Sequence, residues 1–339
     1  MSEFELGELR VAPGTVWKGV LGGVSLFPEV SVGIPAIVVN GAAPGPTLVA
    51  TAAAHGQEIV GTGALIEAVK RIDPAELHGT LVAITVANPL AVMNASYATP
   101  YDGVNICGPL YWPAIDGGTP TQRLASFIAP FLQHADYYVD LHGNANPAAP
   151  MTMMYLDQCS DEETRARTRH MADAFGFTPV DMISDAEAHN TAILGTTAGY
   201  PTAIANAHGV PAIMVELVGN STTQSSGLGA AGMVNVLRAL DLLDGEPEPL
   251  ECERLDGDFV YWGALMADSA GLLWVKRQPG ELLDAGEPIL EITDPWGGTL
   301  QEIAMPTRGF SWGFLGGLYG HGTHAVPEGS MVGFVAKLQ

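Results

Sequence analysis

The stretch TLVATAAAHGQE, residues 47–58, decides how the rest of this 339-residue sequence is interpreted. Residues 47–53 are small or apolar, which is typical of a buried strand. The spacing over residues 57–71 predicts a helix, so His55 and Glu58 would lie three residues apart on a strand-to-helix turn. An imidazole and a carboxylate that converge on one point can hold zinc, provided that a third ligand comes from elsewhere in the chain.

Strands and helices are expected to alternate over the first 245 residues. Apolar runs predict further strands at residues 34–40, 81–86, 136–141 and 211–215. Helical spacing predicts helices at residues 120–133, 161–175, 201–207 and 230–243. Residues 1–30 are only weakly periodic, and residues 88–119 form a long Gly-, Pro- and Asn-rich loop of the kind that is usually functional. This alternation favours an α/β fold.

The pattern changes after about residue 255. Short β-like runs there alternate with Gly, Pro and Asp turns, which is typical of a small all-β unit. Residues 245–249 have the composition of a linker. We therefore expect a catalytic domain over residues 1–245 and a β domain over residues 246–339.

The formal net charge of -23 arises from 14 Lys and Arg against 37 Asp and Glu. No basic run occurs, which argues against nucleic acid or an anionic membrane as a partner. An acidic surface could favour cationic ligands, although solubility explains it equally well. The three cysteines are far apart and suggest neither a disulfide framework nor a thiolate metal site.

The sequence does not show the patterns expected of a secreted or membrane-spanning chain. The N-terminus is acidic and lacks a signal-peptide pattern, and Gly and Pro interrupt every apolar run. We expect a soluble cytoplasmic protein that acts on a small molecule, and a homo-oligomer is compatible with the sequence.

Three candidate site residues, His55, His142 and Glu216, each fall at or just past the carboxyl end of an expected strand. Ligand sites of open α/β sheets gather along that edge. His55, Glu58 and His142 would hold one Zn²⁺ per chain, with a position left open for water. Glu216 could serve as general base, and Asp140 could fix the tautomer of an imidazole.

Each of these signals has an ordinary structural explanation when taken alone. A single His-x-x-Glu often occurs by chance, and Glu216 could be a carboxylate at a helix start. The matching strand-end positions make the combination stronger than its parts. His189 lies in an irregular stretch and could line the site.

An ordered set of short motifs then extends over essentially the whole chain. These motifs are Asn40-Gly41, Pro44-Gly45-Pro46-Thr47, His55-Gly56-Gln57-Glu58, Gly79, Asn88-Pro89, Asp102-Gly103-Val104-Asn105, Arg123-Leu124-Ala125, Asp140-Leu141-His142 and Val215-Glu216-Leu217. The set resembles the succinylglutamate desuccinylase/aspartoacylase family, relatives of the zinc carboxypeptidases, and is nearest the branch that includes an N-acetyl-diaminobutyrate deacetylase.

This resemblance implies a mixed, mostly parallel sheet of zinc-carboxypeptidase type, flanked by helices and followed by a small C-terminal all-β domain. It also implies zinc held by His55, Glu58 and His142. Glu216 would act as the base in the hydrolysis of an N-acyl amide.

The chain departs from the family at one place. The family motif continues after its asparagine into Arg-x-Phe-Pro-Gly, whose arginine grips the substrate carboxylate, whereas Ile106 to Leu110 follow Asn105 here. Residues 88–122 contain no Lys or Arg. We therefore expect a substrate whose recognised end is neutral or cationic, with Asn94, Tyr97 or Asn105 as hydrogen-bond donor in place of arginine.

The resulting expectation is a zinc-dependent amidohydrolase of the deacylase type, acting on C–N bonds other than peptide bonds. An esterase on the same zinc site is one alternative. A catalytically inactive binding or regulatory member of the family is another.

Overall fold

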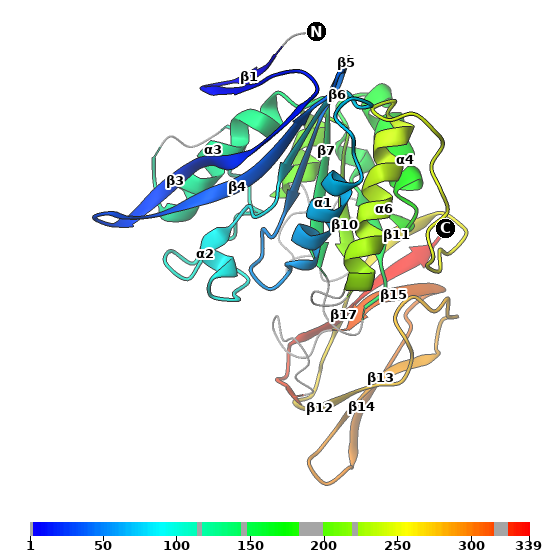
Figure 1. Cartoon of the computed structure of the whole chain (residues 1–339). Helices are drawn as coiled ribbons and strands as arrows, with labels where there is room; N and C mark the ends of the chain where they lie inside the picture. The colour runs from blue at the N-terminus through cyan, green and yellow to red at the C-terminus, as the bar shows by residue number, and fades with distance from the viewer. Residues whose placement is uncertain (1–2, 114–116, 144–147, 183–198, 219–222, 315–324) are drawn as a thin grey trace.

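The computed structural model of the chain describes residues 3–113, 117–143, 148–182, 199–218, 223–314 and 325–339 (Figure 1). Its centre is an eleven-stranded sheet with the order β15-β17-β11-β9-β8-β10-β7-β5-β6-β4-β3. The strands of this sheet are β3 (Thr15–Phe27), β4 (Val30–Asn40), β5 (Ala43–Ala52), β6 (His78–Ile84), β7 (Tyr137–Gly143), β8 (Met151–Met154), β9 (Thr178–Asp181), β10 (Ala212–Leu217), β11 (Phe259–Met266), β15 (Gly309–Phe314) and β17 (Met331–Leu338).

Helices cover both faces of this sheet. The helices are α1 (Val60–Lys70), α2 (Pro89–Val92), α3 (Pro120–Gln133), α4 (Glu162–Phe175), α5 (Pro201–Ala207) and α6 (Thr223–Ala239), with a 3₁₀ turn at Leu156–Gln158. Apolar residues of α1, α4 and α6 pack with Leu48 and Ala50 of β5, whereas those of α3 pack with Val49. Because neighbouring residues of a strand point to opposite faces, β5 is buried on both sides.

The pairing directions confirm the expected α/β class with a mixed sheet. Strands β10, β7, β5 and β6 are neighbours and run parallel. Pairings with β3, β4, β15 and β17 are antiparallel. Parallel pairing therefore predominates in the centre of the sheet, and the carboxyl ends of these parallel strands meet at one edge of it.

The C-terminal strands divide between two sheets. Strands β12 (Gly271–Val275), β13 (Pro288–Thr293), β14 (Thr299–Ala304) and β16 (Ala325–Val326) form a separate antiparallel sheet, which projects from the main body (Figure 1). This sheet agrees with the expected small β unit. Strand β11, in contrast, pairs in parallel with β9 and brings β17 and β15 into the large sheet. The division of the chain at residue 245 stays a prediction.

Several elements differ from the sequence predictions. The N-terminal region, for which no element was expected, forms β1 (Phe4–Leu6), β2 (Leu9–Val11) and the long β3. The short strands β8, β9 and β15 were also missed. Helix α6 begins at Thr223, ahead of the predicted residue 230, because its glycine-rich first half packs closely on α1. The helices predicted at residues 120–133 and 201–207 are confirmed.

Candidate metal centre

A sharp turn after β5 presents His55 and Glu58. Ala53 has φ of 52°, in the left-handed region that non-glycine residues seldom adopt, so the chain leaves the strand abruptly. Gly56 then passes against the backbone of α2, where a Cβ would collide with the carbonyl of Ala91. The turn therefore depends on a small residue at position 56 and on the placement of α2.

The long loop after β6 is fixed to this turn by two polar side chains. Asn88 is fully buried, caps α2 by accepting from the Ala91 amide, and donates to the Thr99 hydroxyl. Asp102 accepts from both the amide and the hydroxyl of Thr121 at the start of α3. These contacts hold the loop across the carboxyl edge of the sheet.

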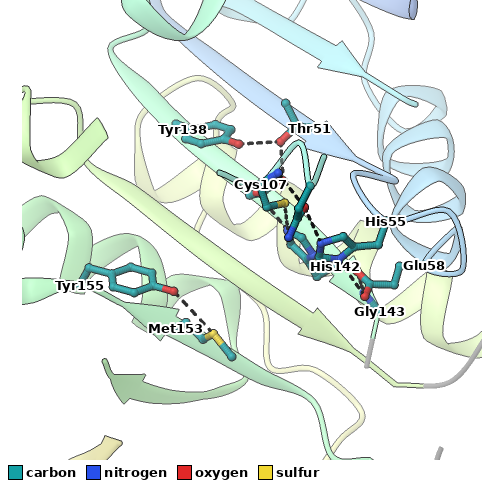
Figure 2. Close-up of polar contacts among 11 residues, drawn as sticks. Thr51, His55, Glu58, Cys107, Tyr138, His142, Gly143, Met153 and Tyr155 are labelled. Atoms are coloured by element: carbon teal, nitrogen blue, oxygen red, sulfur yellow. Dashed lines mark hydrogen bonds and ion pairs between the residues drawn. The ribbon is translucent and has the colours of Figure 1, made fainter. Parts of the chain in front are cut away.

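The two imidazoles approach one carboxylate from two strands. Nδ1 of His55 lies 3.0 Å from Oε1 of Glu58, and Nδ1 of His142 lies 2.8 Å from Oε2 (Figure 2). His142 belongs to β7, the strand next to β5. Sequence positions 55, 58 and 142 are thus brought together at one point, with both histidines buried.

The opposite edge of each imidazole contacts a different group. Nε2 of His55 lies 3.2 Å from Oδ1 of Asn105, and Nε2 of His142 lies 3.0 Å from Oδ2 of Asp140. The other oxygen of Asp140 accepts from the hydroxyl of Thr51, which also contacts Tyr138 (Figure 2). This arrangement turns both Nδ1 atoms toward Glu58, because each ring is held at its Nε2 side.

The electrostatics of the cluster follow from burial and from the close opposite charges. Burial would lower the pKa of His55, but Glu58 and Cys107 outweigh it and raise the pKa to about 10. Burial likewise opposes the charged form of Glu58, yet His55 and His142 hold its pKa below the usual range. Asp140 and Cys107 raise the pKa of His142 well above its ordinary value against the effect of burial. Protons therefore occupy the cluster when no metal does.

The atoms that face Glu58 fit a divalent metal ion. Nδ1 of His55 is buried, and no described group is aligned for a hydrogen bond with it despite the 3.0 Å approach of Glu58. A buried imidazole nitrogen and a carboxylate oxygen at this separation can share a metal cation, which would displace the protons that occupy the cluster without metal. Two imidazole nitrogens and a carboxylate form a typical ligand set for zinc, and Asn105 and Asp140 are suited to orient the ligands.

Cys107 is a site residue that the sequence analysis missed. It is buried, and its Sγ lies 3.7 Å from Nε2 of His142. One ligand atom each of His55, Cys107 and His142 lies within 4.8 Å of the others, so this thiol is among the possible metal ligands, which the spacing of the three cysteines did not indicate. The conformation of the loop brings Cys107 inward. The one hint in the sequence was its position two residues after Asn105, a candidate site residue.

Glu216 lies beside His142 on the neighbouring parallel strand β10, in direct register with it. Burial and the charge of Glu58 raise the pKa of Glu216 to about 8. A carboxyl group poised near neutral pH is suited to exchange protons. His142 and Glu216 both lie within the last two residues of their strands, slightly earlier than the sequence predicted.

The remaining candidates have different surroundings. The ring of Tyr97 stacks on His55, with 3.8 Å between centroids, and burial, Tyr200 and Cys107 raise the pKa of its hydroxyl. Asn94 is exposed, and its amide donates to the Leu90 carbonyl, directed back to its own helix. His189 lies outside the described residues.

The fold and this cluster define the class of the protein: an α/β enzyme scaffold with titratable groups gathered at the carboxyl edge of its sheet. The catalytic-domain model of the succinylglutamate desuccinylase/aspartoacylase family matches residues 44–239. The chain therefore belongs to this family, as the ordered motifs indicated.

Individual relatives agree with this assignment. An N-α-acetyl-L-2,4-diaminobutyric acid deacetylase of Halomonas elongata is 26% identical over 254 residues, which cover 74% of this chain and 71% of the relative. A succinylglutamate desuccinylase/aspartoacylase structure from Rhodobacter sphaeroides is 25% identical, with a TM-score of 0.77 and 96% of each chain covered. The product-bound ectoine utilization protein EutE (DoeB) of Ruegeria pomeroyi is 22% identical, with a TM-score of 0.77 and 95% of each chain covered.

Membership of a family of deacylases supports a hydrolase that acts on a small molecule. In the part of the chain that the structure describes, no helix is both long and apolar enough to cross a membrane.

Proposed function

We propose that this protein is a zinc-dependent hydrolase that cleaves the amide bond of a small N-acyl or amide substrate lacking the carboxylate that the family's arginines recognise. The convergence of both Nδ1 atoms on the Glu58 carboxylate carries the proposal. His55, Glu58 and His142 would hold the ion, one per chain.

A zinc ion in this position supplies Lewis-acid polarisation of the substrate carbonyl and makes water more acidic. The protein side chains do the rest. Asn105 and Asp140 keep the imidazoles in the orientation that turns Nδ1 inward.

Glu216 is the proposed base. It takes a proton from the attacking water as the C–O bond forms, and it returns that proton to the amine nitrogen as the C–N bond breaks. Its pKa of about 8 belongs to the metal-free molecule, in which Glu58 is an unneutralised neighbour. A cation bound by Glu58 is expected to lower this pKa, so that Glu216 is ionised when the site is complete.

Tyr97 is the proposed donor to the oxyanion that forms when water adds to the carbonyl. Its hydroxyl stays protonated because burial raises its pKa, and its ring lies against His55. Asn105 is a second candidate donor, since the contacts of its Oδ1 with His55 and with the Cys107 amide fix the side chain and leave its Nδ2 as the donor. Asn94 is less suited, because its Nδ2 donates to the Leu90 carbonyl.

The Halomonas relative, named for removal of an acetyl group from an amine nitrogen, supports the choice of an amide bond. We infer that the recognised end of the substrate is neutral or cationic because residues 88–122 contain no Lys or Arg.

The deciding experiment compares two variants for metal content and turnover of N-acetyl amides. Glu216→Gln should bind one zinc ion per chain and lose nearly all turnover, whereas Glu67→Gln on the surface of α1 should retain both. Full activity of Glu216→Gln contradicts the assignment of the base. Faster turnover of matched esters than of amides would indicate the esterase alternative, and failure of the wild-type protein to bind metal would favour a binding or regulatory role.

A second pair of variants tests which edge of the histidines holds the ion. Glu58→Gln should weaken zinc binding far more than Cys107→Ser. The reverse order would assign the ion to the His55, Cys107 and His142 set instead.

A further inference from the structure

The hairpin of β3 and β4 carries exposed apolar side chains away from the body of the molecule. Its tip extends past α3 (Figure 1). At this tip Phe27 and Val30 are paired, and they are 71% and 51% exposed. Strand β3 is also the last strand in the order of the large sheet, so no described strand pairs with its outer edge. Apolar side chains in such a position commonly mark a surface that another protein chain covers.

A groove of about 560 Å³ lies at the base of the same hairpin. It is enclosed by β3, by α3 and by the hairpin of β1 and β2. Its lining is mainly apolar and includes Leu6, Leu9, Trp17, Val20, Phe127 and Phe131. The groove is large enough to receive the side chains of Phe27 and Val30.

The tip and the groove lie on the same face of the β3–β4 hairpin. Val32 packs into the apolar cluster that includes α3. Because alternate residues of a strand point to the same face, Val30 lies on the α3 side as well, together with its cross-strand partner Phe27. Trp17 and Leu21 line the groove and pack into the same cluster. One molecule therefore presents both an apolar tip and an apolar groove on one face.

A second copy of the chain can fill both grooves at once. Within one molecule the tip cannot reach the groove, because Val20 and Phe27 are roughly 20 Å apart along β3. When the hairpins of two copies lie face to face and antiparallel, a two-fold axis near residues 23 and 24 brings Phe27 of each copy to Val20 of the other. Such a contact uses the same surface patch twice and closes on itself.

Charge favours this face for contact between two copies. The formal net charge of the chain is -23, so two copies repel one another over most of their surfaces. Residues 15–40 contain one base, Lys18, and one acid, Glu29, whose formal charges cancel. The groove adds Glu8 and Arg10, whose formal charges cancel as well. The hairpin and its groove are therefore a locally neutral surface on an acidic protein.

The hairpin of β13 and β14 also projects from the body and carries an exposed aromatic residue, Trp296 (Figure 1). Residues 288–304, however, contain Glu291, Asp294 and Glu302 and no Lys or Arg. Lys276 of β12 pairs with only one of these acids, Glu291. This second hairpin therefore stays acidic and is poorly suited to meet a copy of itself.

We propose that two copies of this chain associate through their β3–β4 hairpins, with Phe27 and Val30 of each copy seated in the groove of the other. Two register shifts interrupt the pairing of β3 with β4, so side chains make this contact rather than a continuous run of backbone hydrogen bonds between the copies. The inference is independent of the proposed hydrolase activity, because none of these residues belongs to the candidate metal centre.

Sedimentation equilibrium of the full chain tests the association. The wild type should be a dimer at micromolar concentration. Phe27→Asp should raise the dissociation constant at least about thirtyfold, the factor expected when a buried contact residue of an interface is lost. Ser126→Lys, which places a charge on the α3 side of the groove, should do the same. Trp296→Asp on the other hairpin is the matched control and should associate like the wild type, and urea unfolding checks the fold of each variant.

Mixing the two weakened variants decides which surfaces meet. In a mixed dimer the introduced carboxylate of Phe27→Asp faces the introduced ammonium group of Ser126→Lys, and the second pair of tip and groove is unaltered. An equimolar mixture should therefore recover the dimer. A monomeric wild type, a dimer that survives Phe27→Asp, or a mixture that stays monomeric overturns the proposal. Loss of the dimer in Trp296→Asp would assign the interface to the other hairpin and overturn it as well.

Discussion

Asp140 is expected to control metal affinity without being a ligand. It is 2% exposed, and its two oxygens lie 3.0 Å from Nε2 of His142 and 2.5 Å from the hydroxyl of Thr51. Asp140→Asn can preserve both contacts, since the amide oxygen can accept from His142 while the amide nitrogen donates to Thr51. The substitution therefore removes the negative charge and little else.

The size of the effect follows from that burial. Removing an outer partner of a metal-binding histidine typically weakens metal affinity 10- to 100-fold, or about 1.4–2.7 kcal/mol. Because Asp140 is almost completely shielded from water, we expect the upper part of this range. The free energy of unfolding of the metal-free protein should also fall, because Asp140 is one of the two carboxylates that stabilise the protonated imidazole of His142.

Competition of the protein with a chromogenic chelator for zinc measures this affinity, and urea unfolding checks the fold. Asp136→Asn is the matched control, because Asp136 lies just before the same strand and accepts from the Thr47 amide at the opposite end of the sheet. Unchanged zinc affinity in a folded Asp140→Asn variant would refute the reasoning, as would an equal loss in Asp136→Asn.

Three further predictions concern the proton load of the site and the packing of the helices. Because the pKa of His55 is raised to about 10, the metal-free imidazole stays protonated below that pH. The apparent zinc affinity should therefore rise with pH up to about 10, since zinc must displace the proton. Calorimetry in buffers of different ionisation enthalpy measures the protons released on zinc binding. Gly229→Ala should destabilise the protein by about 1–3 kcal/mol in urea unfolding, since its Cβ would lie 2.8 Å from that of Ala64, whereas Gly227→Ala, with open space, should stabilise it by about 0.5–1 kcal/mol. Leu65→Ala, fully buried between α1 and the sheet, should cost about 2–5 kcal/mol in the same assay.

Elements with local signals were predictable from the sequence. Helix α3 has the predicted bounds because Thr119 and Gln122 form a capping box and Pro120 occupies the first turn. The strand that leads to His55 and the strand that carries His142 were recognisable as continuous apolar runs. Parallel strands share an edge, so the meeting of these side chains followed from the strand assignments alone.

Elements without local signals were not predictable. The glycines at positions 227, 229 and 232 lower the helix propensity of α6, and only packing against α1 and its neighbours overrides that preference. Cys107 reaches the histidines because contacts between distant residues fix its loop, among them that of Asp102 with Thr121. Such contacts leave no periodic trace in the sequence.

The parallel pairing of β9 with β11 has a consequence for the order in which the chain folds during synthesis. Strand β9 is made well before β11. Until β11 arrives, the hydrogen-bonding edge of β9 and the apolar surface that Phe259, Tyr261 and Trp312 later cover stay open. The nascent chain on the ribosome thus has an unpaired sheet edge at β9. A chaperone that shields this edge, or slow translation before residue 259, would affect the yield of folded protein without any change in its final stability.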